Sequence, residues 1–145
     1  MAKLLRNASR KPVSVPETAT VLEAVKTMVK ERIGAVVVMK GKKMTGIFSE
    51  RDVLDKIVLA RRDPAKTKIS AVMTSDVLSI PAPGDDSEAA TTMAEHHIRH
   101  LPIVDGKKKV VGVVSLRHVM EDRIADLEHE VNVLTAYLGY DGVAG

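Results

Sequence analysis

The chain has 145 residues, 45% hydrophobic and 28% charged, which is the balance of a soluble globular protein and not of a disordered chain. Its 22 Lys and Arg residues exceed its 19 Asp and Glu residues by only three, and one Phe, two Tyr and no Trp leave few rings for stacking bases, so nucleic-acid binding is disfavoured. The absence of Cys excludes disulfides, thiolate metal sites and a cysteine nucleophile, and it fits a reducing cytoplasm.

The first residues of the chain do not resemble a signal peptide. The first 17 residues lack an apolar stretch long enough for a signal peptide, and nowhere do about 18 consecutive apolar residues predict a membrane span. We therefore expect a cytoplasmic protein without membrane contact.

The sequence contains an internal duplication. When residues 13–39 are aligned with 78–104, identical residues coincide at Ser14/Ser79, Pro16/Pro81, Glu23/Glu88, Ala24/Ala89, Thr27/Thr92, Met28/Met93 and Ile33/Ile98. After one inserted residue, GIFSERDV (46–53) aligns with GVVSLRHV (112–119). A period this long indicates a duplicated domain, not a solenoid.

The first repeat predicts the order strand, helix, strand, hairpin, strand, helix. Thr20 and Glu23 form a T-x-x-E capping box, and the apolar residues after it recur at helical spacing. We expect strands at 13–15 (ended by Pro16), 33–38 and 45–48, a turn at 40–43, and a second helix over 54–63 before an ordered crossing segment.

The second repeat follows the same pattern. A strand at 77–80 ends at Pro81, a helix begins within 85–88, and strands follow at 101–104 and 110–114. Asp105-Gly106 suits the positive φ values of a type I′ hairpin turn.

This tandem β-α-β-β-α order, with G-[IV]-[FV]-S-x-x-[DH]-V in each half, resembles the cystathionine-β-synthase (CBS) domain pair, or Bateman module. Ile69–Thr74 (ISAVMT) resembles the segment that commonly precedes a CBS repeat, and IRHLPIVD (98–105) resembles the second strand of the family. The resemblance implies an α/β fold of two repeats related by a pseudo-twofold axis, with two clefts for adenosine-containing ligands. We expect repeat one at 1–66, repeat two at 67–120 and a helical extension at 121–145.

Ser49 and Asp52 are the central candidates for ligand binding. A Ser between a strand and a helix offers a hydroxyl and free amides to a phosphate, and Asp52 can accept hydrogen bonds from both ribose hydroxyls. The same spacing also describes a plain helix cap. The resemblance favours binding, and Arg51 between them joins the candidate set.

The other candidate residues of this first cleft are aliphatic residues of the first repeat and polar residues of the second repeat. Aliphatic residues could clasp the base, although each of them is also a candidate for simple core: Val15, Ile33, Gly34, Ala35 and Val36. The resemblance implies that phosphate contacts cross from the opposite repeat, which nominates Arg99 and His100; a solvated charge is the alternative for Arg99.

The second cleft departs from the family pattern. His118 stands where the ribose-binding Asp is expected, and an imidazole is not a two-oxygen acceptor. We expect the cleft of Ile80, Leu101, Ser115 and His118 to be empty, weaker or differently specific.

Two other polar clusters favour no chemistry. His96, His97 and His100 have the spacing of metal ligands on a helix, but the helix should end near Arg99, so we expect no metal site. Lys107–Lys109 is interpreted as a solvated hairpin tip.

The C-terminal segment lies outside the repeat and shows a heptad seam. Apolar residues follow one another at alternating spacings of four and three: Met120, Ile124, Leu127, Val131, Leu134 and Leu138. We expect a helix over 115–138, ended by Gly139, whose seam meets a second chain; folding back onto its own core is the alternative.

The expected function is therefore regulatory and energy-sensing. The chain lacks G-x-S-x-G and P-loop motifs, so we expect no enzyme and no catalytic cofactor. We expect a homodimer that binds an adenine nucleotide, with AMP favoured over ADP, ATP, NAD or S-adenosylmethionine, and that signals occupancy to an unidentified protein. A ligand-free interaction or stress-associated scaffold stays open as the alternative.

Overall fold

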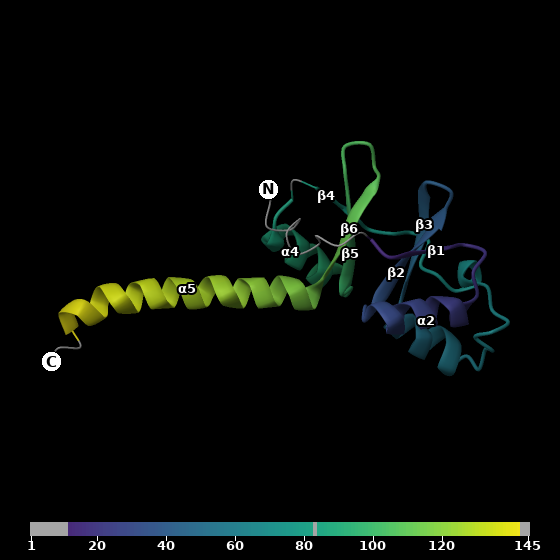
Figure 1. The fold of residues 1–145 in the computed structure, drawn as a ribbon, viewed down its shortest axis with the longest axis horizontal. Coiled ribbons are helices and arrows are strands. Elements are labelled where there is room, and N and C mark those ends of the chain that lie inside the picture. Colours follow the sequence, from purple (N-terminus) through teal and green to yellow (C-terminus); the bar gives the residue numbers. More distant parts are fainter. Residues whose placement is uncertain (1–11, 83, 143–145) are drawn as a thin grey trace.

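The computed structural model describes residues 12–82 and 84–142, and its two halves carry corresponding elements in the same order (Figure 1). The first half contains β1 (Ser14–Pro16), α2 (Val21–Glu31), β2 (Ala35–Lys40), β3 (Lys43–Ser49), the single turn α3 (Glu50–Asp52), the π-helix η1 (Val53–Val58) and the 3₁₀ turn η2 (Ile69–Ala71). The second half contains β4 (Ile80–Pro81), α4 (Asp86–His96), β5 (His100–Val104), β6 (Val110–Ser115) and α5 (Leu116–Gly142). The first residues, where no signal peptide was expected, and the outer ends of the expected domains lie outside the described residues.

Each half forms a three-stranded sheet, ordered β1-β2-β3 and β4-β5-β6, with a parallel first pair and an antiparallel second pair. The register shifts between Val38 and Met39 in β2, and between Ile103 and Val104 in β5. These are equivalent positions of the two repeats. The predicted α/β duplication is confirmed, down to the irregularity in the strand.

The two prolines lie within the strands that they were expected to end. Pro16 pairs with Met39 and Pro81 pairs with Val104, and β4 is shorter than predicted. The prediction assumed that a Pro, which has no backbone N–H, cannot pair with a neighbouring strand. Because β1 and β4 are edge strands, the missing donor lies on the unpaired side and costs no ladder hydrogen bond.

The first helices of both halves begin and end in the same way. The Thr20–Glu23 capping box is complete, and the side chain of Asp85 accepts a hydrogen bond from the Glu88 N–H at 2.8 Å. Each helix ends on a residue in the left-handed region, Arg32 (φ 56°) or His97 (φ 54°). These caps set the angle at which the chain enters β2 and β5.

Two apolar clusters form the core, one in each half. In the first, Val36, Val38 and Phe48 are fully buried together with residues of α2. In the second, Leu101, Ile103 and Val114 are fully buried together with residues of α4. Val37, on the opposite face of β2, belongs to neither cluster and is only 1% exposed.

The crossing segment between the halves is ordered, as predicted. Ile69 is fully buried and its N–H donates to the carbonyl of Ala19 at 2.8 Å. Further on, Thr74 exchanges two backbone hydrogen bonds with Ile47, at 2.9 and 3.0 Å, along the outer edge of β3. The segment therefore pairs with the middle of this sheet edge before it starts the second half.

The second helix of the first half differs from the prediction of 54–63. It begins at Glu50 as α3 and continues as the π-helix η1, where the N–H of Leu59 bonds to the carbonyl of Leu54. Only Ile57 is buried; Leu54 and Val58 are 60% and 61% exposed. The five-residue hydrogen bond widens the helix and shifts its side chains out of the expected spacing.

The hairpin of the second half is not the expected type I′ turn. Its positive φ (61°) falls on Lys108, while Asp105 accepts hydrogen bonds from the N–H groups of Lys107 and Lys109 at 2.8 and 2.9 Å. Those two bonds, that from Lys109 first, lower the pKa of Asp105 below its ordinary value. The Asp side chain therefore organises a longer turn than Asp-Gly alone predicted.

Helix α5 extends past Gly139 to Gly142, so the predicted end is wrong. One Gly costs only about 1 kcal/mol inside a helix, and here it does not end one. At 27 residues the helix is about 40 Å long and projects away from both halves (Figure 1). Its six seam residues are 49–64% exposed, which contradicts folding back onto the core.

We expect Thr20→Ala to lower the free energy of unfolding by about 1 kcal/mol, because it removes the hydroxyl that accepts the Glu23 N–H and so breaks the capping box. Urea denaturation followed by circular dichroism measures the change. The exposed neighbour Thr18→Ala is the control and should change stability by about 0.5 kcal/mol or less. Equal effects of the two substitutions would contradict the role of the cap.

Candidate functional site

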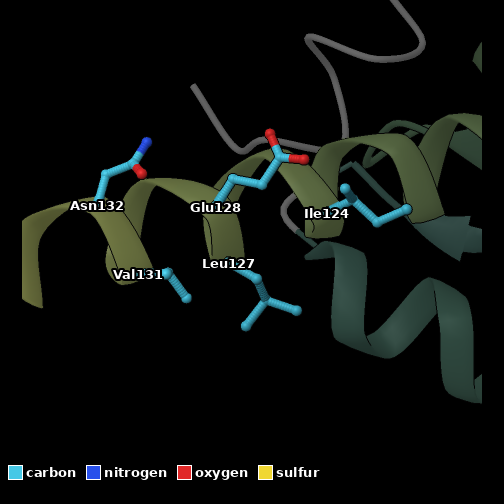
Figure 2. Close-up of a pocket in the computed structure, with 5 residues that line it drawn as sticks. All are labelled: Ile124, Leu127, Glu128, Val131 and Asn132. Atoms are coloured by element: carbon cyan, nitrogen blue, oxygen red, sulfur yellow. The ribbon is translucent and has the colours of Figure 1, made fainter. Parts of the chain in front are cut away.

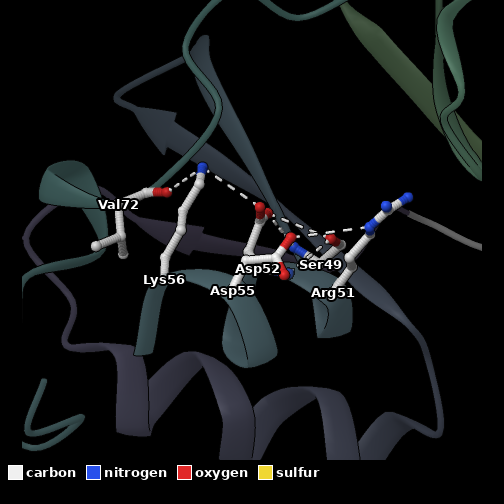
Figure 3. A network of polar contacts seen from close by, with 6 residues as sticks. All are labelled: Ser49, Arg51, Asp52, Asp55, Lys56 and Val72. Carbon is white, nitrogen blue, oxygen red and sulfur yellow. Dashed lines mark hydrogen bonds and ion pairs between the residues drawn. The ribbon is translucent and has the colours of Figure 1, made fainter. Parts of the chain in front are cut away.

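Ser49 and Asp52 lie where β3 passes into α3, and they bind each other (Figure 3). The N–H and the hydroxyl of Ser49 donate to Oδ2 of Asp52 at 2.9 and 3.2 Å. The N–H of Asp52 in turn donates to Oγ of Ser49 at 3.4 Å. The two residues thus form the helix cap that their spacing allowed, and this cap places the carboxylate at the end of the strand.

Lys56 holds the other oxygen of Asp52, a partner that the sequence analysis missed. Its Nζ lies 3.3 Å from Oδ1 of Asp52 and donates to the carbonyl of Val72 at 2.7 Å (Figure 3). The Asp52 side chain is 15% exposed, so this pair is shielded more than a surface ion pair. The i,i+4 spacing of Asp52 and Lys56 was the available signal. The predicted site residue Arg51 contacts Asp55 instead, at 3.8 Å.

His100 crosses from the second half to the first. A Cβ built at Gly34 would lie 2.8 Å from Nε2 of His100 and 3.3 Å from Oε1 of Glu50, so the ring occupies the space that Gly34 leaves open. Gly34 also accepts a hydrogen bond from the N–H of Glu50 at 2.9 Å. The structure therefore brings a predicted residue of each half together, and no side chain larger than Gly fits at position 34 without displacing the His.

Burial lowers the pKa of His100 from its ordinary value of 6.5. The carboxylate of Glu50 opposes this shift, while the nearby side chains of Arg99 and His118 add to it. His100 is therefore held in its neutral form among charged neighbours. Arg99 itself is exposed, and its carbonyl accepts the N–H of Leu116 at 2.7 Å.

Ser115 and His118 repeat the cap geometry in the second half. The hydroxyl of Ser115 accepts the N–H of His118 at 3.2 Å, and it lies 2.9 Å from Nδ1 of the same residue. The imidazole thus takes the place of the Asp52 carboxylate in the same backbone frame. The two halves present the same local shape with different charge.

Four of the predicted apolar contacts are core residues. Val15 and Val36 belong to the first cluster, and Ile80 and Leu101 belong to the second. Their side chains pack under the helices, because alternate positions of a strand point to opposite faces. Ile33 and Gly34 directly precede β2, are half-buried, and pack against the first cluster and against His100, respectively; Ala35 begins β2 and is 6% exposed.

Two hollows of the described surface lie elsewhere. One runs along α5 beside three of its seam residues, and the other lies between α2 and η1 with apolar walls and Arg61 and Arg62 at its rim. Among the described residues no three His, Cys, Asp or Glu side chains gather as metal ligands do. Within the same ranges, every helix is too short or too polar to cross a bilayer.

Comparison with known proteins agrees with this geometry. The family model of the CBS domain matches residues 5–59 and 69–124. The mitochondrial CBS domain-containing protein CBSX3 of Arabidopsis thaliana is 32% identical over 124 residues, covering 82% of this chain and 60% of the relative. The chain therefore spans less than two thirds of that protein.

Two solved structures resemble this chain closely. A protein with CBS domains from Burkholderia ambifaria superimposes with a TM-score of 0.80 and 31% identity, over 87% of this chain and 94% of its own. The CBS domain protein PAE2072 of Pyrobaculum aerophilum, solved in complex with AMP, gives a TM-score of 0.73 and 31% identity over 79% of this chain and 88% of its own.

We expect the stability of the protein to fall as the pH drops below about 6.5, where the unfolded chain takes up a proton that folded His100 resists. Melting temperatures at pH 7.5 and 5.5 measure the loss. In His100→Gln the fall should be smaller. His129→Gln, on exposed α5, should keep the wild-type fall, and identical behaviour of both variants would contradict the burial of His100.

Proposed function

The chain belongs to the CBS-domain family, and from this membership we propose that it is a regulatory nucleotide-binding module whose first cleft takes an adenosine nucleotide. AMP is the favoured ligand. The observation that carries the proposal is the Ser49–Asp52 pair: a carboxylate held at the end of a strand, beside the first amides of a helix, in a chain 31% identical to a protein solved with AMP.

In this proposal Asp52 accepts hydrogen bonds from the ribose hydroxyls. Its Oδ1 faces Lys56 and its Oδ2 faces Ser49, so the carboxylate is oriented before the ligand arrives. The hydroxyl of Ser49 and the guanidinium of Arg99 are the groups assigned to the single phosphate. The contact of the His100 ring with Gly34 lies at the boundary of the two halves. This set reaches one phosphate, which is why AMP is favoured over ATP, NAD and S-adenosylmethionine.

The module works without a catalytic step of its own in this proposal. Its clefts are shared between two repeats, so ligand binding changes how the halves are held together, and a homodimer passes that change to a protein partner. The cytoplasm supplies the ligand. A ligand-free interaction scaffold is the second candidate function, and the observation that favours it is the replacement of the second carboxylate by His118.

We expect AMP to bind in the micromolar range, because about 23 heavy atoms at roughly 0.3 kcal/mol each give about 7 kcal/mol. Asp52→Asn should weaken binding about tenfold or more, since the amide keeps one acceptor for the Ser49 N–H but replaces the other with a donor. Isothermal titration calorimetry measures both affinities.

The control for this substitution is Asp55→Asn, one turn away and 57% exposed, which should leave AMP affinity unchanged. His118→Ala should also leave it unchanged. Loss of binding in the His118 variant alone would show that the second cleft is the site, and no AMP binding by the wild type at millimolar concentration would favour the scaffold.

The second cleft allows a test by gain of function. His118→Asp gives the Ser115 cap the same carboxylate as the first half, so we expect the stoichiometry to rise from about one to about two AMP per chain. Calorimetry with native mass spectrometry counts the bound nucleotides. An unchanged stoichiometry would show that groups other than residue 118 disable this cleft.

A further inference from the structure

Helix α5 carries an apolar stripe that the described part of the chain leaves uncovered. Its seam residues are about half to two thirds exposed, whereas Val119, in the first turn of the helix, is buried. Leu127 and Val131 project from one side of the helix, and Glu128 and Asn132 project from the other (Figure 2). A shallow groove runs beside these residues. Helices are stabilised in proteins mainly by packing of such a stripe, so a partner is expected here.

The residue types of the seam select the kind of partner. The spacing places Ile124, Val131 and Leu138 at heptad position a, and Met120, Leu127 and Leu134 at position d. β-branched residues at a with Leu at d favour two-stranded parallel coiled coils. Two of the three a positions and two of the three d positions follow that rule.

The flanking charges select the same arrangement. Arg123 occupies a g position and Glu128 the e position five residues later, and both are exposed. In a parallel pair, g of one helix faces the following e of the other, which sets Arg123 against Glu128 of the partner subunit. In a fully overlapped antiparallel pair, Glu128 and Glu130 would each face their own counterparts, placing like charges together.

We propose that α5 pairs with α5 of a second copy of this chain as a parallel two-stranded coiled coil. The pairing buries the seam of both helices and forms two Arg123–Glu128 ion pairs across the interface. Because the helices are parallel, both CBS pairs lie at the same end of the coiled coil. The proposal is independent of whether a nucleotide binds.

Sedimentation of the full chain tests the association. The wild type should be a dimer, and the double substitution Leu127→Lys and Leu134→Lys should produce a monomer, because charges at d positions cannot be solvated inside the interface. The matched control carries Lys on the outer face, at His129 and Asn132, and should stay dimeric. A monomeric wild type, or a dimeric seam variant, would overturn the proposal.

Circular dichroism keeps the result interpretable. The seam residues are exposed in the single chain, so the folded halves should keep their helix and strand signal in the seam variant.

Arg123→Glu should raise the dimer dissociation constant about tenfold, and the added Glu128→Arg should restore it by exchanging the two charges. Absence of this rescue would overturn the assigned g–e pairing.

Cysteine cross-linking tests the orientation, and the chain has no Cys to interfere. Leu134→Cys should form a disulfide with its own copy in a parallel dimer, and so should Ile124→Cys. In the antiparallel pair each Cys would lie about 15 Å from its counterpart, and only a mixture of the two variants would cross-link, between positions 124 and 134. Mixed disulfides without self-linked ones would overturn the parallel arrangement.

Discussion

Each sheet has three strands and a helical layer on only one face, so its other face has to be buried against the opposite half. Val37 is 1% exposed without belonging to either core cluster, and Pro102 at the equivalent place of β5 is also buried. Neither repeat could satisfy this requirement alone. The union of the halves is what brings His100 against Gly34, and with it every feature of the candidate site that involves both repeats.

The features predicted from the sequence are those set by neighbouring residues. The Thr20 cap and the Ser49–Asp52 pair depend on side chains within a few positions of one another, and the hairpin depends on the positive φ of Gly41, so local sequence was sufficient. The duplication extended these predictions to the second half. Predictions failed where the position of a strand within its sheet determines the outcome. Pro16 and Pro81 are tolerated because their strands lie at a sheet edge, and local sequence does not reveal which strands those are.

The remaining site geometry needed the tertiary structure. Lys56 reaches the carbonyl of Val72 across 16 residues, and the contact of His100 with Gly34 spans both repeats. For Val36 the sequence already contained the signal needed to predict its position. It shares with Val38 the face of β2 that packs under α2, so the alternation of side chains along a strand would have assigned it to the core. In the proposed binding mode, the hydrogen bonds that Ser49 already makes to Asp52 mean that a ligand exchanges partners instead of adding them, which suits reversible binding.

The two edge prolines have a consequence for the behaviour of the protein at high concentration. An unpaired strand normally offers a row of amide donors onto which a foreign strand can add, the first step towards cross-β fibrils. Pro16 and Pro81 remove a donor from strands of only three and two residues, and Thr74 occupies the far edge of the first sheet. Strand addition is therefore disfavoured at these borders.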